Sequence, residues 1–133
     1  MPGIDAASSC PQLPRQDTLA PKLLYAVDAR LTPSSPVADI SRLASLTAAA
    51  VAAGSGHVLD TSHVIFPNGA ITLVLILAES HLAIHTWPEE NLIAIDLFSC
   101  GAIDGEAVIS GLVRSLRLTA VSVRTLDRGL VNL

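Results

Sequence analysis

The sequence has few of the residues that mark several common classes of protein. Aromatic residues make up only 3% of its 133 residues, so aliphatic side chains must do most of the core packing. Two cysteines are too few for a disulfide framework. The eight lysines and arginines are scattered and the net charge is −4, which argues against binding to the phosphate backbone of nucleic acids.

Long hydrophobic runs and targeting segments are also missing. The longest apolar run, residues 70–78, is far shorter than the roughly 20 residues that span a bilayer. The N-terminal stretch lacks a basic region followed by an apolar core, so we expect a cytoplasmic protein without membrane contact. Residues 1–21 are rich in proline, serine and small polar residues, which predicts a flexible tail ahead of a single domain at 22–133.

Aliphatic residues, in contrast, are abundant. Half of the chain is hydrophobic, whereas a domain of this size buries only about two-thirds of the surface that its unfolded chain exposes. Some apolar surface should therefore remain outside the core of a single copy, which favours an oligomer.

The spacing of apolar residues predicts the order strand, helix, four strands, helix, strand. Ser35 is the expected N-cap of the first helix, with Pro36 at the first helical position and Gly54 at the end of the helix. Asp104 is the expected N-cap of the second helix, over 104–116. Short turns among the four middle strands require antiparallel pairing, so we predict an α+β two-layer sandwich: an antiparallel sheet with two helices on one face and the other face left to a partner. The expected strands are 22–30, 57–66, 70–78, 81–87, 91–98 and 119–126.

Polar and reactive side chains are concentrated in the stretch "AESHLAIHTWPEENLIAIDLFSCG". Ser80 could be a simple turn residue, and the G-x-S-x-G pattern of many hydrolases is absent. Side chains alternate between the two faces of a strand, so His81 and His85 should share one face of the expected strand 81–87. They would be about 13 Å apart, too far to bind one zinc ion. A pairing of Cys100 with a histidine as nucleophile would leave Glu79 and Ser80 unexplained. We predict no metal site.

The stretches "ESHLAIHTWPE" and "IDLFSCG" resemble the prokaryotic S-adenosylmethionine decarboxylases, a small pyruvoyl-dependent family. The spacing of Ser80, His85 and Cys100 matches the three functional positions of that family. The resemblance implies that the bond between Glu79 and Ser80 is cut by the chain itself, giving a β chain of residues 1–79 and an α chain of 80–133. Ser80 would become a pyruvoyl group, which forms a Schiff base with the substrate.

The resemblance also assigns supporting roles in processing and catalysis. His85 matches an acid–base group that acts in processing, since an imidazole can exchange a proton near neutral pH. Thr72 stands where the family usually has a serine that assists processing, and it keeps the hydroxyl. Cys100 matches the proton donor that acts after carbon dioxide leaves; taken alone, it could also be a small buried apolar residue.

The substrate pocket of the family implies further residues. Phe66 matches an aromatic position that can stack on adenine or attract the sulfonium cation, and Glu89 matches a carboxylate that accepts hydrogen bonds from ribose. Leu82 and Trp87 match positions that line or frame the pocket. Phe66 and Trp87 could equally be core residues. The family's site lies at a dimer interface, which implies a homodimer.

Decarboxylation of an amino acid needs an electron sink that ordinary side chains do not supply. The single lysine, Lys22, lies far from the motif in the sequence and no phosphate-binding loop is visible, so we expect no pyridoxal phosphate. The family resemblance implies a self-generated pyruvoyl group in its place.

Two departures from the family lie near the substrate end. Glu90-Asn91-Leu92 replaces an aromatic-glycine-aromatic turn, and "KLLYAVDAR" lacks a Gly-x-His motif. The leading hypothesis is an S-adenosylmethionine decarboxylase that serves spermidine synthesis. The alternatives are decarboxylation of ornithine or arginine, with Glu90 holding a second ammonium group, and a non-catalytic regulatory paralogue, which would have no reason to keep the reactive residues.

Overall fold

The computed structural model describes residues 21–129 and has the predicted order of elements. Its sheet has six strands in the order β2-β3-β4-β5-β1-β6, and each pair of neighbours is antiparallel. The tail predicted at 1–21, with Cys10, lies outside the described residues apart from position 21. The elements are β1 (Lys22–Arg30), α2 (Ile40–Ala53), β2 (Val58–Ile65), β3 (Ile71–Leu77), β4 (Ser80–Trp87), the 3-10 helix η1 (Pro88–Glu90), β5 (Leu92–Cys100), α3 (Gly105–Ser115) and β6 (Thr119–Arg128).

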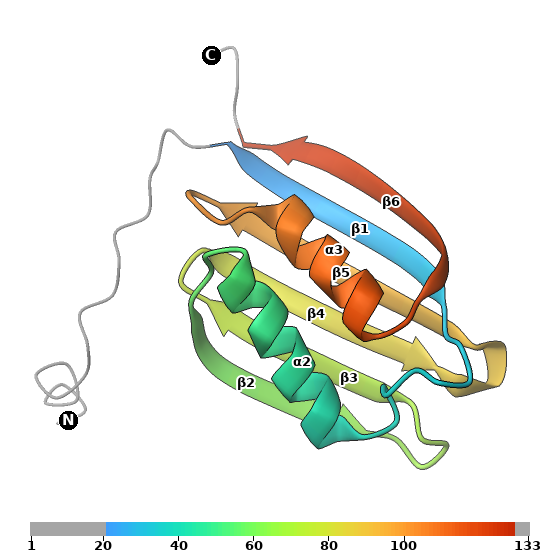
Figure 1. Cartoon of the computed structure of the whole chain (residues 1–133). Coiled ribbons are helices and arrows are strands. Elements are labelled where there is room, and N and C mark those ends of the chain that lie inside the picture. Colours follow the sequence, from blue (N-terminus) through green and yellow to red (C-terminus); the bar gives the residue numbers. More distant parts are fainter. Residues whose placement is uncertain (1–20, 130–133) are drawn as a thin grey trace, which may run out of the picture.

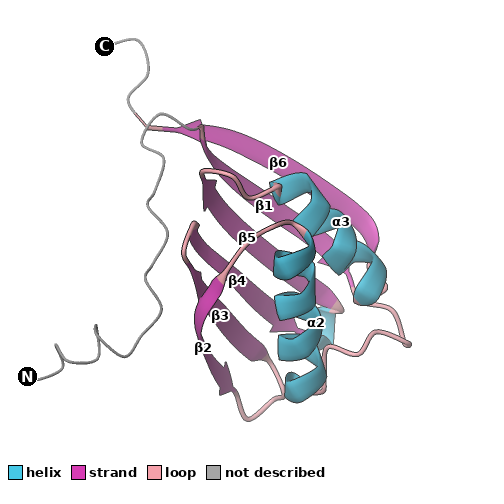
Figure 2. Cartoon of the chain, turned by 60° about the vertical axis from the view of Figure 1, so that its left-hand side comes forward, coloured by secondary structure: helices cyan, strands magenta, loops and turns pink. Residues whose placement is uncertain are grey.

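Both helices cover one face of the sheet, so the predicted two-layer α+β sandwich is confirmed (Figures 1 and 2). The alternation along β4 shows why: Leu82 and Ile84 point toward the helices and are fully buried, whereas His81 and His85 point to the open face. The core between the layers is aliphatic, as the scarcity of aromatic residues requires. Its fully buried side chains include Leu43, Leu73, Leu75, Leu82, Ile84, Ile93, Ile95, Leu97 and Leu112.

The start of the first helix differs from the prediction. Asp39, not Ser35, is the N-cap of α2, and its carboxylate accepts hydrogen bonds from the backbone of Ser41 at 3.1 Å and Arg42 at 3.2 Å. Ser35 and Pro36 instead lie in the preceding turns, which are also common positions for a Ser-Pro pair. A carboxylate that satisfies two free N–H groups decides where the helix begins.

The other predicted helix boundaries are confirmed. Gly54 ends α2, and its N–H donates to the carbonyl of Ala50. Asp104 is the N-cap of α3 and accepts a hydrogen bond from the backbone of Ala107 at 3.1 Å. Among the described residues, no helix has both the length and the apolar character needed to cross a membrane.

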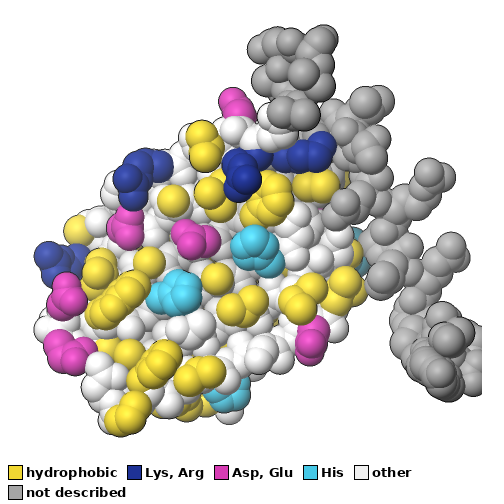
Figure 3. Space-filling model, turned by 180° about the vertical axis from the view of Figure 1, so that it is seen from behind, with side chains coloured by type: hydrophobic (Ala, Val, Ile, Leu, Met, Phe, Trp, Pro, Cys, Tyr) yellow, Lys and Arg dark blue, Asp and Glu magenta, His cyan; other side chains and the backbone are white. Residues whose placement is uncertain are grey.

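The face of the sheet that carries no helix exposes both apolar and charged side chains (Figure 3). Lysines and arginines gather mainly along the edge formed by β1 and β6, where Arg124 pairs with Asp28 at 3.0 Å and Arg128 lies over the ring of Phe98 at 5.5 Å. Large hydrophobic side chains also lie on this open face, and each is between 40% and 56% exposed: Val64, Ile76, Trp87 and, between the two arginines of β6, Leu126. A surface of this kind is typical of a contact between proteins.

Candidate active site

The site residues expected from the sequence lie at the two ends of β4. Glu79, Ser80 and Cys100 lie together at the start of the strand, and we call this group the turn end. The pocket end, near the finish of the strand, comprises Phe66, Thr72, His85, Trp87 and Glu89.

At the turn end, Ser80 has an unusual backbone conformation. Its φ angle is +146°, a region that residues with a side chain rarely adopt. This torsion turns about the bond between the Ser80 nitrogen and its Cα, and the same nitrogen belongs to the Glu79–Ser80 peptide. Backbone strain is therefore located directly beside the bond that the family resemblance marks for cleavage.

The carbonyl of that peptide is held by the neighbouring strand. The backbone N–H of Cys100, at the end of β5, donates a hydrogen bond to the carbonyl oxygen of Glu79 at 3.0 Å. The side chain of Cys100 is buried, with 6% of the residue exposed. A donor fixed on a carbonyl oxygen can stabilise negative charge that develops there during nucleophilic attack.

The side chain of Glu79 is held as well. His57, just before β2, donates its backbone N–H to one carboxylate oxygen at 3.0 Å, and its ring Nδ1 lies 2.7 Å from the other oxygen. The carbonyl of His57 in turn accepts the N–H of Ala78 at 2.9 Å. His57 therefore binds both the Glu79 side chain and the Ala78 backbone in the β3–β4 turn.

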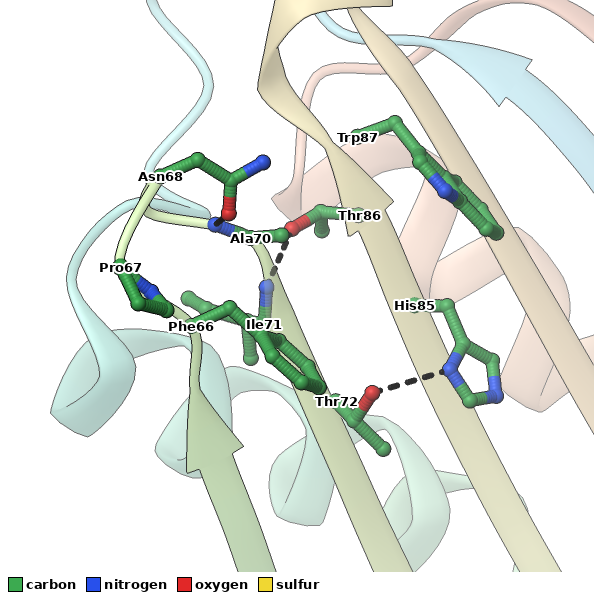
Figure 4. A pocket seen from close by; sticks show the side chains of 9 residues that line it. All are labelled: Phe66, Pro67, Asn68, Ala70, Ile71, Thr72, His85, Thr86 and Trp87. Atoms are coloured by element: carbon green, nitrogen blue, oxygen red, sulfur yellow. Dashed lines mark hydrogen bonds between the residues drawn. The ribbon is translucent and has the colours of Figure 1, made fainter.

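At the pocket end, Thr72 and His85 are directly opposite each other on β3 and β4 and both point to the open face. The Thr72 hydroxyl lies 3.2 Å from Nδ1 of His85 (Figure 4). One ring nitrogen of His85 is thereby engaged, which orients the ring and leaves the other nitrogen for proton transfer.

Thr72 and His85 line a hollow of about 540 Å³. Phe66 and Trp87 are 45% and 40% exposed, and the ring of Trp87 lies 6.3 Å from that of His85, centre to centre. The hollow therefore has the aromatic surfaces that a purine or a cation would contact. Its lining residues are Phe66, Pro67, Asn68, Ala70, Ile71, Thr72, His85, Thr86 and Trp87 (Figure 4).

Glu89 lies beside this hollow in η1 and is held by Asn68. The Asn68 amide donates to one carboxylate oxygen of Glu89 at 2.9 Å, while its own oxygen accepts the N–H of Ala70 at 3.1 Å. The second bond fixes the orientation of the amide. The first, together with a backbone hydrogen bond, lowers the pKa of Glu89 below its ordinary value and so favours the carboxylate form.

The structure does not bring every expected residue together. Leu82 points to the opposite face of the sheet and is fully buried in the core, so its side chain does not reach the hollow. Leu82 was expected to line or frame the pocket; its side chain instead packs under the helices, because it alternates with His81 and His85. Ser80 and His85 are five residues apart on one strand, which separates them by about 16 Å.

Two residues at the site were not among those expected from the sequence. His57 lies 22 positions before Glu79, to which it binds, and no spacing rule connects the two residues. Asn68 falls between the expected strands 57–66 and 70–78, where a turn is the ordinary interpretation. Its proximity to Glu89 follows from antiparallel pairing, which brings the β2–β3 turn and the end of β4 to the same edge of the sheet.

The turn after the "HTWPE" motif contains a residue with a left-handed backbone conformation. Asn91 stands where the family usually has glycine, and its φ and ψ angles of 49° and 42° are left-handed. Asparagine is one of the few residues with a side chain that adopts this conformation readily. Asparagine can therefore occupy this position without a large backbone penalty.

Comparison with known proteins agrees with this architecture. The structure superimposes on that of the adenosylmethionine decarboxylase from Aquifex aeolicus with a TM-score of 0.72, covering 85% of this chain and 94% of the other at 24% identity. The two proteins therefore share a fold.

The sequence profile of S-adenosylmethionine decarboxylase matches residues 24–129. Proenzymes of that name are similar to the chain in Picrophilus torridus (34% identity over 80% of this chain and 78% of the relative) and Thermoplasma acidophilum (36% over 79% and 77%). The proenzyme 2 of Bacillus anthracis is 39% identical over 56% of this chain, and the alignment spans 61% of that relative's length. The chain belongs to the S-adenosylmethionine decarboxylase family, as the motif resemblance predicts.

Proposed function

We propose that the chain cuts its own Glu79–Ser80 bond and becomes a pyruvoyl-dependent S-adenosylmethionine decarboxylase. The observation that carries this proposal is the bonding at the turn end. The carbonyl of the scissile peptide already accepts a hydrogen bond from Cys100, and the adjoining Ser80 backbone is strained. Both features favour attack on that carbonyl, and membership of a proenzyme family supplies the type of reaction.

The chemistry of self-cleavage follows from these groups. The Ser80 hydroxyl adds to the Glu79 carbonyl carbon, and the Cys100 N–H stabilises the negative oxygen that forms. The C–N bond then breaks and leaves an ester. Removal of the Ser80 α-proton expels the Glu79 carboxylate, and the resulting dehydroalanine rearranges, takes up water and releases ammonia, which leaves a pyruvoyl group. That group supplies a keto carbon that accepts the electrons left when carbon dioxide departs.

By the family motif, the base that removes the α-proton is His85. His85 is oriented by Thr72 but lies about 16 Å along the strand from Ser80. We infer that a second copy packs on the open face, with its strands running in the opposite direction. A two-fold arrangement of this kind sets the turn end of each chain against the pocket end of the other. The exposed apolar side chains of the open face support such a homodimer.

In the assembled site each residue has a defined task. The Cys100 thiol, next to Ser80 in its own chain, returns a proton to the substrate carbon after decarboxylation. Phe66 and Trp87 of the other copy provide aromatic surfaces for the adenine and the sulfonium cation. Glu89, kept ionised by Asn68, accepts hydrogen bonds from the ribose hydroxyls.

The structure gives less support to ornithine or arginine as the substrate. Those substrates need a second anionic group at the pocket; Glu89 is bound to the lining residue Asn68, and Glu90 has no such bond among the described residues. The backbone carbonyl of Glu90 instead accepts a hydrogen bond from Arg30 at 2.9 Å.

Intact-mass measurement of the purified protein tests the proposed function. We expect two chains, 1–79 and 80–133, with the second lighter by one ammonia than hydrolysis alone would leave it. The processed protein should release carbon dioxide from S-adenosylmethionine and not from ornithine or arginine. A chain that stays whole under mild conditions, or one that cleaves and acts only on a basic amino acid, would contradict the proposal.

A further inference from the structure

We propose that His57 is a positioning residue for self-cleavage, acting through the carboxylate of Glu79. The inference rests on the proposed cleavage of the Glu79–Ser80 bond and adds a residue that lies outside the family motif. His57 directly precedes β2, the edge strand beside β3, and contacts the turn between β3 and β4. It has no part in the substrate pocket.

The contacts of His57 converge on the residue whose carbonyl is attacked. Its backbone N–H and its ring Nδ1 bind the two carboxylate oxygens of Glu79, at 3.0 and 2.7 Å. Its carbonyl accepts the N–H of Ala78 at 2.9 Å. The Glu79 side chain is only 12% exposed, so water competes little for it, whereas that of His57 is 64% exposed. His57 therefore adds little to the core and much to the orientation of the turn.

Fixing Glu79 matters because the first step of cleavage is intramolecular. The Ser80 hydroxyl oxygen forms a bond to the Glu79 carbonyl carbon, the C–N bond breaks, and the hydroxyl proton moves to the released nitrogen. Nothing else is consumed or released in this step. Its rate depends on how well the carbonyl is held against the hydroxyl. Cys100 holds the carbonyl oxygen, and His57 holds the other end of the same residue.

The inference predicts a specific pattern among variants of His57. H57A keeps the backbone N–H but loses the ring, so cleavage should slow by about tenfold, as expected for the loss of a hydrogen bond to a charged group. H57N places an amide N–H near the position of Nδ1, and its cleavage rate should return to within about threefold of the natural chain. His63, which is exposed on β2, provides the matched control, and H63A should cleave at the natural rate.

The experiment follows cleavage of freshly made chain in cell-free synthesis, by intact mass at successive times. The uncut H57A chain should give no fragment that ends at Glu79 when treated with hydroxylamine, because its defect precedes the ester at that position. In an E79A background the H57A change should slow cleavage no further, since residues that act through one contact are not additive. Circular dichroism should show that H57A and H63A are both folded at the temperature of the cleavage assay, so that slow cleavage of H57A does not reflect unfolding.

The outcomes separate the two proposals. If the natural chain is cut and H57A is cut at the same rate, the role of His57 is wrong and the proposed function stands. The role is also wrong if H57A slows cleavage equally with and without Glu79, or if H57N gives no rescue. If the natural chain is never cut, the proposed function fails and this inference fails with it.

Discussion

The two ends of β4 differ in how their residues are held. At the turn end, the backbone N–H groups of Cys100 and His57 fix Glu79, and the cleavage residues all match the family motif. The pocket end is built largely from side chains of turns and of the open face, and both departures from the family were expected near it. The comparison teaches that main-chain groups hold the carbonyl proposed to be attacked, whereas the hollow proposed for the substrate is lined mainly by side chains.

The largest effect should come from removing the nucleophile at the turn end. S80A leaves no hydroxyl to attack the Glu79 carbonyl, so cleavage should stop altogether and no decarboxylation should follow. Intact mass and carbon dioxide release check both expectations. The matched control is S62A on the exposed strand β2, which should be cut like the natural chain; residual cleavage of S80A at that same bond would rule out the mechanism.

The next largest effect should separate the two roles of Cys100. C100A keeps the backbone N–H that binds the Glu79 carbonyl, so cleavage should proceed within about threefold of the natural rate, provided that this N–H is what matters. Loss of the thiol should lower turnover of S-adenosylmethionine by about a hundredfold or more, the usual effect of removing a general acid. Gel analysis and single-turnover kinetics measure the two rates; equal loss of both would show that the thiol itself is needed for cleavage.

A smaller effect is expected at the pocket end from Asn68. N68D keeps the oxygen that accepts the Ala70 N–H but replaces the donor to Glu89 by a second carboxylate. The KM for S-adenosylmethionine should rise by roughly tenfold while cleavage is unchanged.

The pH dependence of KM in a second variant, N68A, tests the same contact. Asn68 lowers the pKa of Glu89, so N68A should raise that pKa and cause Glu89 to take up its proton at a higher pH. The acidic limb of the KM profile should therefore move to higher pH in N68A. A limb that stays in place would mean that Glu89 does not contact the substrate.

The smallest effect concerns Asn91, in the replaced turn. N91A should destabilise the fold by about 1 kcal/mol, because alanine disfavours the left-handed backbone at φ 49°. N91G should leave stability within about 0.5 kcal/mol of the natural chain. Urea unfolding followed by circular dichroism measures both. An equal loss in the two variants would show that the Asn91 side chain, rather than its backbone angle, matters.

The fold could be predicted largely from the sequence, because apolar spacing reports directly on buried faces. The alternation of Leu82 and Ile84 with His81 and His85 on β4 is the clearest case. The pocket role expected for the Leu82 side chain came from the family resemblance alone, and the alternation observed along β4 places that side chain in the core. The predicted start of α2 at Ser35 was wrong because a Ser-Pro pair suits a turn as well as a helix start, and Asp39 offers the stronger cap.

The site could be predicted only in part. The motif identified Ser80, His85 and Cys100, but strand geometry, not residue type, separates Ser80 from His85. The contacts of His57 with Glu79 and of Asn68 with Glu89 depend on pairing between segments that are distant in the sequence. Local residue spacing does not predict them.

The central claim is that the turn end of one chain works with the pocket end of another, and complementation tests it most directly. Chains carrying S80A or H85A should each fail to be cut when made alone, the second because it lacks the base for the Ser80 α-proton. When the two are made together, mixed dimers should form in which the H85A chain receives His85 from its S80A partner. The account predicts that the H85A chain is cut and that the S80A chain stays whole; a mixture in which both chains remain uncut, despite forming mixed dimers, would contradict it.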